Sequence, residues 1–119
     1  MSTAGPTERT LKALRKIGYI CQVVERWNAF ARKRVDLFNF IDIIAIKDDK
    51  IVGIQCTSYA NHASRKKKIL DNEIAPTWIE AGGEIQVWSW KKRIVKKRPK
   101  WEPRVEIITE QMFKKKCPF

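Results

Sequence analysis

Two apolar segments on either side of a short acidic turn, residues 40–47 and 51–57, constrain the fold more than any other feature of the chain. Both are rich in β-branched residues, so each is predicted to form a strand, and Asp48-Asp49-Lys50 predicts a hairpin turn between them. Their nearly continuous apolar character is typical of strands that are buried on both faces. We therefore expect this hairpin to form the centre of a sheet.

One carboxylate and two uncharged polar side chains interrupt the apolar hairpin. Pairing of the strands would place Asp42 opposite the end of the second strand, where Gln55 and Thr57 share a face because side chains alternate. A buried carboxylate is costly without a partner or a metal, and oxygen ligands in this arrangement suit Mg²⁺. The alternative hypothesis is that Asp42 caps a turn while Gln55 and Thr57 satisfy backbone groups inside the sheet. The residues alone favour neither reading.

Periodicity and the positions of Gly and Pro predict the other elements. They are a helix at 7–17, a strand at 19–25, a polar and basic loop at 26–39, a helix from Asn61, a second turn or helix at 76–81, and strands at 84–90 and 104–109. The order helix, three strands, helix, two strands contains one crossover that is long enough for parallel pairing. We predict an α/β fold in a single domain, residues 1–119, with a mixed sheet of about five strands flanked by helices.

The formal net charge of +12, from 25 Lys and Arg against 13 Asp and Glu, favours a polyanionic partner. Nucleic acid is the first candidate and an anionic membrane surface the second. Seven of the ten residues at 91–100 are basic and lie between Trp88, Trp90 and Trp101, which predicts a basic β-hairpin at about 88–105. The alternative is a solvated charged face with Trp in the core. We favour nucleic-acid contact, because seven like charges in one hairpin would repel each other.

Two further groups of basic residues are expected to border Asp42 and to grip a phosphate backbone rather than to read bases. His62 is interpreted as a nucleic-acid contact or a hydrogen-bonding residue at a helix start, in preference to a general base. The predicted nucleic-acid contacts are Arg32, Lys33, Arg34, His62, Arg65, Lys66, Lys68, Lys91, Lys92, Arg93, Lys96, Lys97, Arg98 and Lys100.

Cysteine usage and hydropathy exclude several classes of protein. Cys21, Cys56 and Cys117 are an odd number of distant cysteines and the chain has one His, which indicates neither a disulfide framework nor a zinc site. No apolar run approaches the length of a membrane span, and the N-terminus lacks a hydrophobic segment. We expect a cytoplasmic protein, in a bacterial, archaeal or phage-infected cell, with no membrane contact.

The order helix, strand, "FIDIIAIKDDKIVGIQCTS", basic helix resembles the PD-(D/E)xK nuclease superfamily over residues 8–90, in particular archaeal Holliday-junction resolvases and phage VRR-NUC type domains. Asp42 matches the motif Asp, and Gln55-Cys56-Thr57 stands at the Glu-x-Lys position. The resemblance implies a restriction-endonuclease-like fold and a Mg²⁺- or Mn²⁺-dependent DNA endonuclease that acts on branched or structured DNA as a homodimer. It also implies Asp42, Gln55 and the main-chain carbonyl of Cys56 as metal ligands.

The motif departs from that family at two positions. Gln55 keeps an oxygen but loses a negative charge, and Thr57 cannot replace the Lys ammonium. A cation could come from Arg34, Arg65 or Lys68.

For the missing acid we favour Glu25 over Glu8 and over Asp36, for which a capping role is the stronger interpretation. The predicted catalytic residues are Glu25, Asp42, Gln55 and Thr57. The alternative functions are a catalytically inactive nuclease-fold DNA-binding module and, more weakly, a basic RNA-associated protein.

Overall fold

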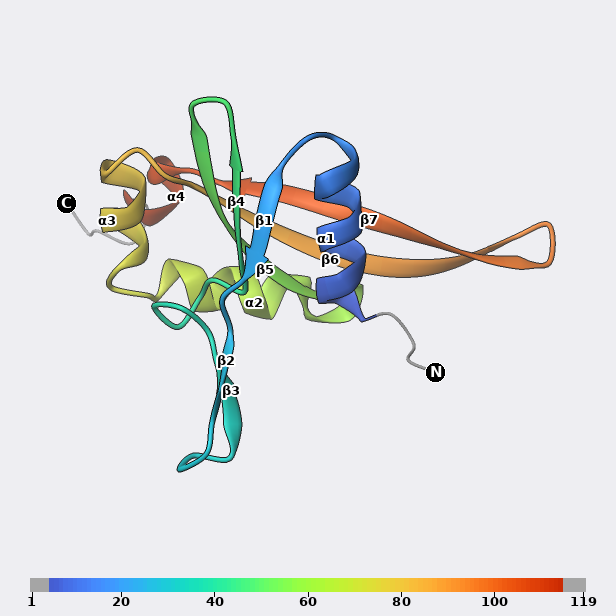
Figure 1. Cartoon of the computed structure of the whole chain (residues 1–119), viewed down its shortest axis with the longest axis horizontal. Helices are drawn as coiled ribbons and strands as arrows, with labels where there is room; N and C mark the ends of the chain where they lie inside the picture. The colour runs from blue at the N-terminus through green and yellow to red at the C-terminus, as the bar shows by residue number, and fades with distance from the viewer. Residues whose placement is uncertain (1–4, 115–119) are drawn as a thin grey trace.

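A five-stranded mixed sheet with the order β1-β4-β5-β6-β7 forms the centre of the computed structural model, which describes residues 5–114 (Figure 1). All neighbouring strands are antiparallel except β5 and β6, which the predicted crossover makes parallel. The prediction of an α/β fold with a mixed sheet of about five strands is therefore confirmed. The strands are β1 (Ile20–Val23), β4 (Ile43–Lys47), β5 (Lys50–Ser58), β6 (Glu84–Val95) and β7 (Arg98–Ile108).

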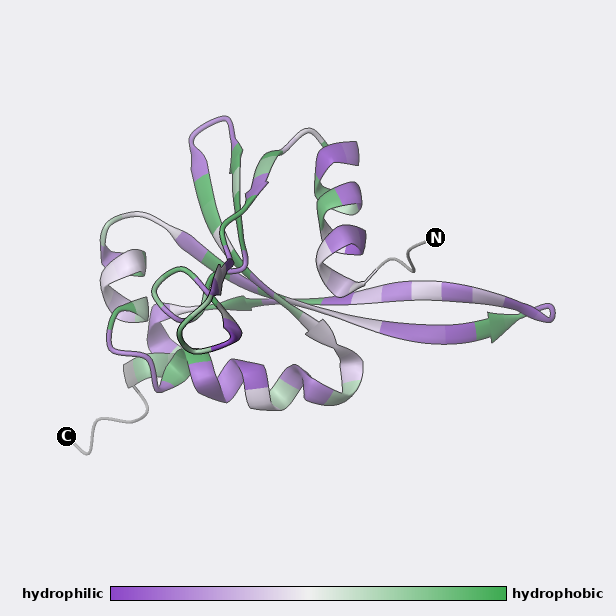
Figure 2. Cartoon of the chain, turned by 60° about the horizontal axis from the view of Figure 1, so that its bottom comes forward, coloured by the Kyte–Doolittle hydropathy of each residue, from purple (hydrophilic) through white to green (hydrophobic). Residues whose placement is uncertain are grey.

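Helices cover both faces of the sheet. α1 (Pro6–Lys16) packs on one face through Leu14, and α2 (His62–Leu70) packs on the other through Ile69. A 3-10 turn (Tyr59–Asn61) leads into α2, and α3 (Ala75–Glu80) and α4 (Glu110–Lys114) complete the second face. Figure 2 shows hydrophobic stretches along the central strands, and also at the far end of β6, where Ile94 and Val95 are exposed. Within residues 5–114, no helix is long and apolar enough to cross a membrane.

The β4–β5 hairpin forms as predicted, although its first strand starts later. Lys47 pairs with Lys50, and Asp48 takes a left-handed φ of 54° that closes the turn. Phe40 and Ile41 precede β4 and are fully buried. The sheet leaves no room above Gly53, where an added Cβ would lie 2.8 Å from Cδ1 of Ile41. The chain before β4 is thus held tightly against β5.

Two hairpins extend from the body, and one of them corrects a prediction. Residues 26–39, expected to be a loop, contain the paired strands β2 (Arg26–Asn28) and β3 (Lys33–Val35), which point away from the sheet (Figure 1). Oδ1 of Asn28 accepts the backbone N–H groups of Phe30 and Ala31, each at 3.0 Å, and Arg32 takes a φ of 52°. These hydrogen bonds and the left-handed residue form the turn of the hairpin. The hydropathy pattern of residues 26–39 does not predict it.

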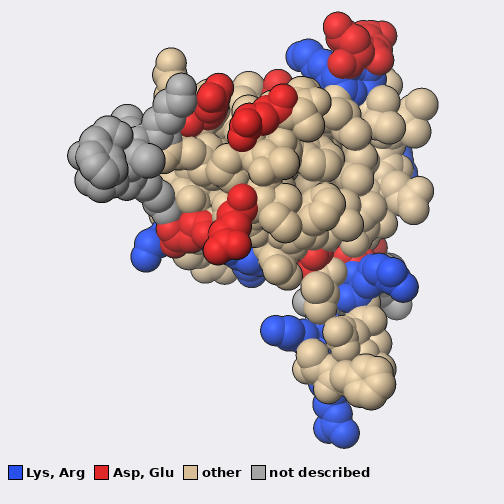
Figure 3. All heavy atoms as spheres, turned by 90° about the vertical axis from the view of Figure 1, so that its left-hand side faces the viewer, with Lys and Arg blue, Asp and Glu red and all other residues tan. Residues whose placement is uncertain are grey.

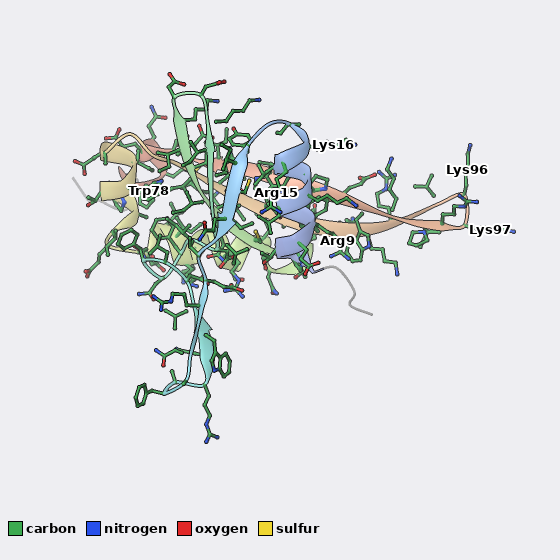
Figure 4. The ribbon with its side chains drawn as sticks, in the orientation of Figure 1. Arg9, Arg15, Lys16, Trp78, Lys96 and Lys97 are labelled. Carbon is green, nitrogen blue, oxygen red and sulfur yellow. The ribbon has the colours of Figure 1, made fainter. Side chains whose placement is uncertain are left out.

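The second hairpin is the predicted basic ribbon, formed by the outer halves of β6 and β7. Residues 85–90 of β6 are buried, whereas residues 91–95 are exposed. Figure 4 shows Lys96 and Lys97 at the far end of this ribbon. The strands pair along their whole length, from Ile85 with Ile108 to Val95 with Arg98.

The two tryptophans before the ribbon are core residues, as the alternative interpretation of these residues has it. Trp88 and Trp90 are 7% and 8% exposed, and their rings lie 6.1 Å apart between centroids. Nε1 of Trp90 donates to Oγ1 of Thr10 at 2.9 Å, which ties α1 to the sheet. Trp101 is 40% exposed, with the Arg9 guanidinium 3.6 Å from its ring centroid.

Candidate active site

Three carboxylates meet where β1 ends and β4 begins. Ligand oxygens of Glu25, Asp36 and Asp42 all lie within 4.8 Å of one another. The backbone of Asp42 is fixed on both sides, because its N–H donates to the Ile54 carbonyl and its carbonyl accepts from Val24, each at 2.8 Å. Glu25 directly follows Val24, and Asp36 directly follows β3. The sheet therefore positions Asp42, and the end of the β2–β3 hairpin places Asp36 beside it.

Asp42 lies opposite Gln55, as the strand pairing predicts. Oδ2 of Asp42 accepts hydrogen bonds from Nε2 of Gln55 at 2.6 Å and from the backbone N–H of Cys56 at 2.9 Å. Among the described residues, Oε1 of Gln55 has no hydrogen-bond partner although it is buried. An unpartnered buried oxygen is costly, so this atom is a ready ligand for a cation that the three carboxylates would hold.

The three acids line a cavity of about 470 Å³ between the start of α1 and α2. Thr57, which is 5% exposed, also lines this cavity. Arg65 and Lys68 reach it from α2, and Nζ of Lys68 lies 3.2 Å from Oδ2 of Asp36. The remaining lining residues are Pro6, Thr7, Gln55, Cys56 and Ser58. Acidic ligands and basic side chains thus share one hollow.

Burial and crowding of like charges set the protonation of the cluster. Burial, and then a hydrogen bond with Asp36 and the charges of Asp36 and Glu25, raise the pKa of Asp42 to about 8. Burial alone would raise the pKa of Asp36, but the hydrogen bond with Asp42 and the Lys68 ammonium outweigh it and lower that pKa. Near neutral pH the pair therefore holds one proton on Asp42. A cation could take the place of that proton.

His62 does not line this cavity, and of its two interpretations the structure supports the hydrogen-bonding residue at a helix start and not the nucleic-acid contact. Its side chain is 2% exposed, so no ligand reaches it. Nδ1 lies 2.6 Å from Oγ of Ser89, and Nε2 lies 2.8 Å from Oε1 of Glu106. Lys66, another predicted contact, donates to Oε2 of Glu106 at 2.7 Å. His62 and Lys66 thus complete an internal network.

Cys56 contributes its backbone N–H to Asp42, while its thiol lies in the core on the α1 face. Burial raises the pKa of this thiol to about 12, so it is not a thiolate ligand. The role of its carbonyl as a metal ligand stays a prediction. Glu8, the rival of Glu25, lies on α1 and lines a different hollow with Leu11 and Arg15.

Most of the other predicted nucleic-acid contacts are exposed on the two hairpins. Arg32 and Lys33 lie on the β2–β3 hairpin, whereas the side chain of Arg34 is outside the described part of the chain. Figure 3 views the α3 end and shows acidic side chains over the body and basic side chains on the β2–β3 hairpin below it. The exposed basic residues of the ribbon are Lys91, Lys92, Arg93, Lys96, Lys97, Arg98 and Lys100.

Sequence reasoning undervalued one acid of the site. Asp36 was interpreted as a cap, because nothing in "RKRVDLFN" shows that β3 ends beside Asp42. The lining residues Pro6 and Thr7 had no sequence signal at all, since they depend on how α1 crosses the sheet.

In comparisons with known proteins, no family model, curated protein or solved structure matches this chain.

Proposed function

We propose that this chain is a metal-dependent DNA endonuclease of the PD-(D/E)xK type with a restriction-endonuclease-like fold. One observation carries the proposal: the Glu25, Asp36 and Asp42 carboxylates lie within 4.8 Å of one another beside a buried Gln55 oxygen that has no hydrogen-bond partner in residues 5–114. Like charges at this distance repel each other, and an all-oxygen ligand set is what Mg²⁺ and Mn²⁺ prefer. The residues present therefore fit a hard divalent cation, which Glu25, Asp36, Asp42 and Gln55 would hold.

Such a cation, when bound, polarises a phosphate oxygen and lowers the pKa of a water. The side chains around it would position the substrate. Lys68 and Arg65 line the cavity from α2 and can pair with phosphate oxygens, which compensates for the absent motif lysine. The Thr57 hydroxyl at the cavity wall can hydrogen-bond a water or a phosphate oxygen. Asp42 has to lose its proton before it can act as a ligand.

A basic surface continues from the cavity along the α2 face of the sheet. Side chains alternate along β6, so Lys91 and Arg93 share a face with Ser89, which contacts His62 of α2. Nζ of Lys91 lies 5.0 Å from the ring centroid of Tyr59, in the turn between β5 and α2. This surface supports contact with a phosphate backbone that passes over the cavity. A homodimer, as the resemblance implies, would supply a second site for the other strand.

The alternative proposal is a DNA-binding module that has lost cleavage. The hydrogen bond from Gln55 to Asp42 supports it, because an amide donor fills the place of a charged metal ligand. The two proposals share the DNA-binding surface and differ in the fate of the phosphodiester bond.

Incubation of the protein with duplex and branched DNA in Mg²⁺, Mn²⁺ or EDTA tests the enzyme. We expect metal-dependent nicking that Asp42→Ala lowers by about 10³-fold, since it removes a central ligand. Asp49→Ala in the exposed β4–β5 turn removes the same charge elsewhere and is the matched control. Tight DNA binding without cleavage in any metal would establish the module, and cleavage that survives Asp42→Ala would move the active site elsewhere.

A further inference from the structure

The β2–β3 hairpin is inserted directly between two acids of the cluster. Glu25 precedes its first residue, Arg26, and Asp36 follows its last residue, Val35. Both ends of the hairpin are therefore fixed at the cavity. Any molecule that contacts the hairpin lies beside the three carboxylates.

Two aromatic side chains on this hairpin are exposed to solvent. Phe30 at its tip is 103% exposed, so no described residue covers it, and Trp27 is 64% exposed. Asn28 holds the tip in place through its two hydrogen bonds to the backbone N–H groups of Phe30 and Ala31. The hairpin thus presents a large apolar ring on a hydrogen-bonded turn. Because this ring is not buried, it contributes nothing to the stability of the core.

Both aromatics also line a cavity of about 460 Å³ on the side of the hairpin. Leu37 and Phe38 form part of its wall, and Asp36 lines both this cavity and the acidic one. An apolar hollow that opens beside carboxylates suits a flat group with an apolar face and polar edges. A nucleobase has this chemistry, and bases stack readily on exposed aromatic side chains.

The charges on the hairpin select the partner. Arg26, Arg32 and Lys33 are exposed around the two aromatics and complement a phosphate backbone. A second copy of this chain would bring a net charge of +12 toward the same cations, which opposes self-association here. Cations interleaved with aromatics are typical of surfaces that bind single-stranded nucleic acid.

Resting on the proposed function, we propose that the β2–β3 hairpin is a base-stacking arm and that Phe30, assisted by Trp27, stacks on an unpaired base next to the cleavage site. A strand rises about 3.3 Å per residue, so the five residues from Arg26 to Phe30, of which the last two lie in the turn, reach at most about 15 Å from the cavity. Stacked nucleotides advance about 3.4 Å each, which places the base within about five nucleotides of the phosphate in the cavity. The preferred substrate class is therefore DNA with unpaired bases rather than a continuous duplex.

Binding in EDTA tests this arm independently of cleavage. The probes are a continuous duplex and the same duplex with a short single-stranded gap that carries 2-aminopurine. We expect Phe30→Ser to weaken gapped-DNA binding about tenfold and to abolish the quenching of 2-aminopurine, while duplex binding stays within about twofold. Phe30→Trp should retain both properties. Ile20→Ser, at a β1 position that is 76% exposed, is the matched control and should change neither.

Several outcomes would overturn the arm. Equal binding of both DNAs, unchanged by Phe30→Ser, would do so and would leave metal-dependent cleavage through Asp42 intact. If Phe30→Ser abolishes a dimer in sedimentation and leaves gapped-DNA affinity unchanged, the hairpin serves self-association. If it abolishes binding to anionic vesicles instead, the hairpin contacts a membrane. A wild-type chain that binds neither DNA would refute both this inference and the proposed function.

Discussion

Two partly buried polar clusters on the same sheet differ in the kinds of side chain that they bring together. In the first, His62 lies between Ser89 and Glu106, and Lys66 bonds the second oxygen of Glu106. Burial alone would raise the pKa of Glu106, but the bonds from Lys66 and His62 outweigh it and lower that pKa. Each polar group in this cluster has a partner of complementary character. The protein itself supplies the partners of the partly exposed Glu106 carboxylate.

The acidic cluster gathers carboxylates beside one another. Ligand oxygens of Glu25, Asp36 and Asp42 lie within 4.8 Å of one another, and Nζ of Lys68 lies 3.2 Å from Oδ2 of Asp36. Burial raises the pKa of Asp42 to about 8, so the cluster takes up a proton. A network of complementary partners stabilises the fold, whereas clustered carboxylates with a raised pKa mark a candidate place for an external ligand.

Breaking the network around His62 should have the largest effect on stability. His62→Ala leaves Ser89 and Glu106 without their buried partner and opens a cavity, which should lower the free energy of unfolding by about 3 kcal/mol. Urea denaturation measures this change. Asn61→Ala, at the exposed neighbouring position, should stay within about 0.5 kcal/mol of wild type. If both variants unfold alike, the His62 bonds carry no net stability and the contrast between the clusters fails.

The sequence predicts the pairing of the strands that carry Asp42 and Gln55, but it predicts less well which other acids lie beside them. Alternation along two apolar strands is enough to place Asp42 opposite Gln55, because register follows from a short turn. Asp36 could not be placed in this way. It reaches the site through the β2–β3 hairpin, whose turn depends on Asn28 and on a left-handed Arg32 rather than on hydropathy.

His62 shows the opposite limit of sequence reasoning. A histidine at the start of a basic helix allows a nucleic-acid contact or a hydrogen-bonding role, and its partners Ser89 and Glu106 lie 27 and 44 residues away along the chain. Nothing local in the sequence indicates that β6 and β7 bring these partners under α2. The sequence leaves Trp88 and Trp90 open between core packing and ligand contact for the same reason, since a basic run follows them while their rings pack in the core.

The acidic cluster should destabilise the metal-free protein as the pH rises. The pKa of Asp42 is about 8 in the folded state against an ordinary value of 3.8, so only the folded state holds this proton between these values. Stability should fall through this window by up to about 1.4 kcal/mol per pH unit and level off above about pH 8. Asp36 has a lowered pKa, so its contribution changes only at lower pH.

Asp42→Asn removes this titration and isolates its effect. In EDTA the free energy of unfolding of the variant relative to wild type should rise by about 2 kcal/mol between about pH 6.5 and about pH 8. Urea titrations across this range provide the measurement. Parallel curves for the two proteins would mean that Asp42 is ionised in the folded state and that the cluster is already balanced within the protein.

The smallest expected change in stability belongs to the variant that tests cation binding most directly. Gln55→Glu replaces the amide that donates to Asp42 at 2.6 Å with a fourth carboxylate. In EDTA the added like charge should lower stability by about 1 kcal/mol, and Mn²⁺ affinity by calorimetry should rise about tenfold, because added ligand charge strengthens cation binding. Gln22→Glu adds the same charge at an exposed position on β1 and should leave Mn²⁺ affinity unchanged.

The two readouts of Gln55→Glu separate the roles of this side chain. A stability loss without a gain in Mn²⁺ affinity would restrict Gln55 to holding Asp42, with its second oxygen outside the coordination sphere. If neither protein binds Mn²⁺ near about pH 8, where Asp42 is half ionised, the acidic cluster holds a proton only. The two clusters would then differ in stability alone, and the DNA-binding module would be the better account of the chain.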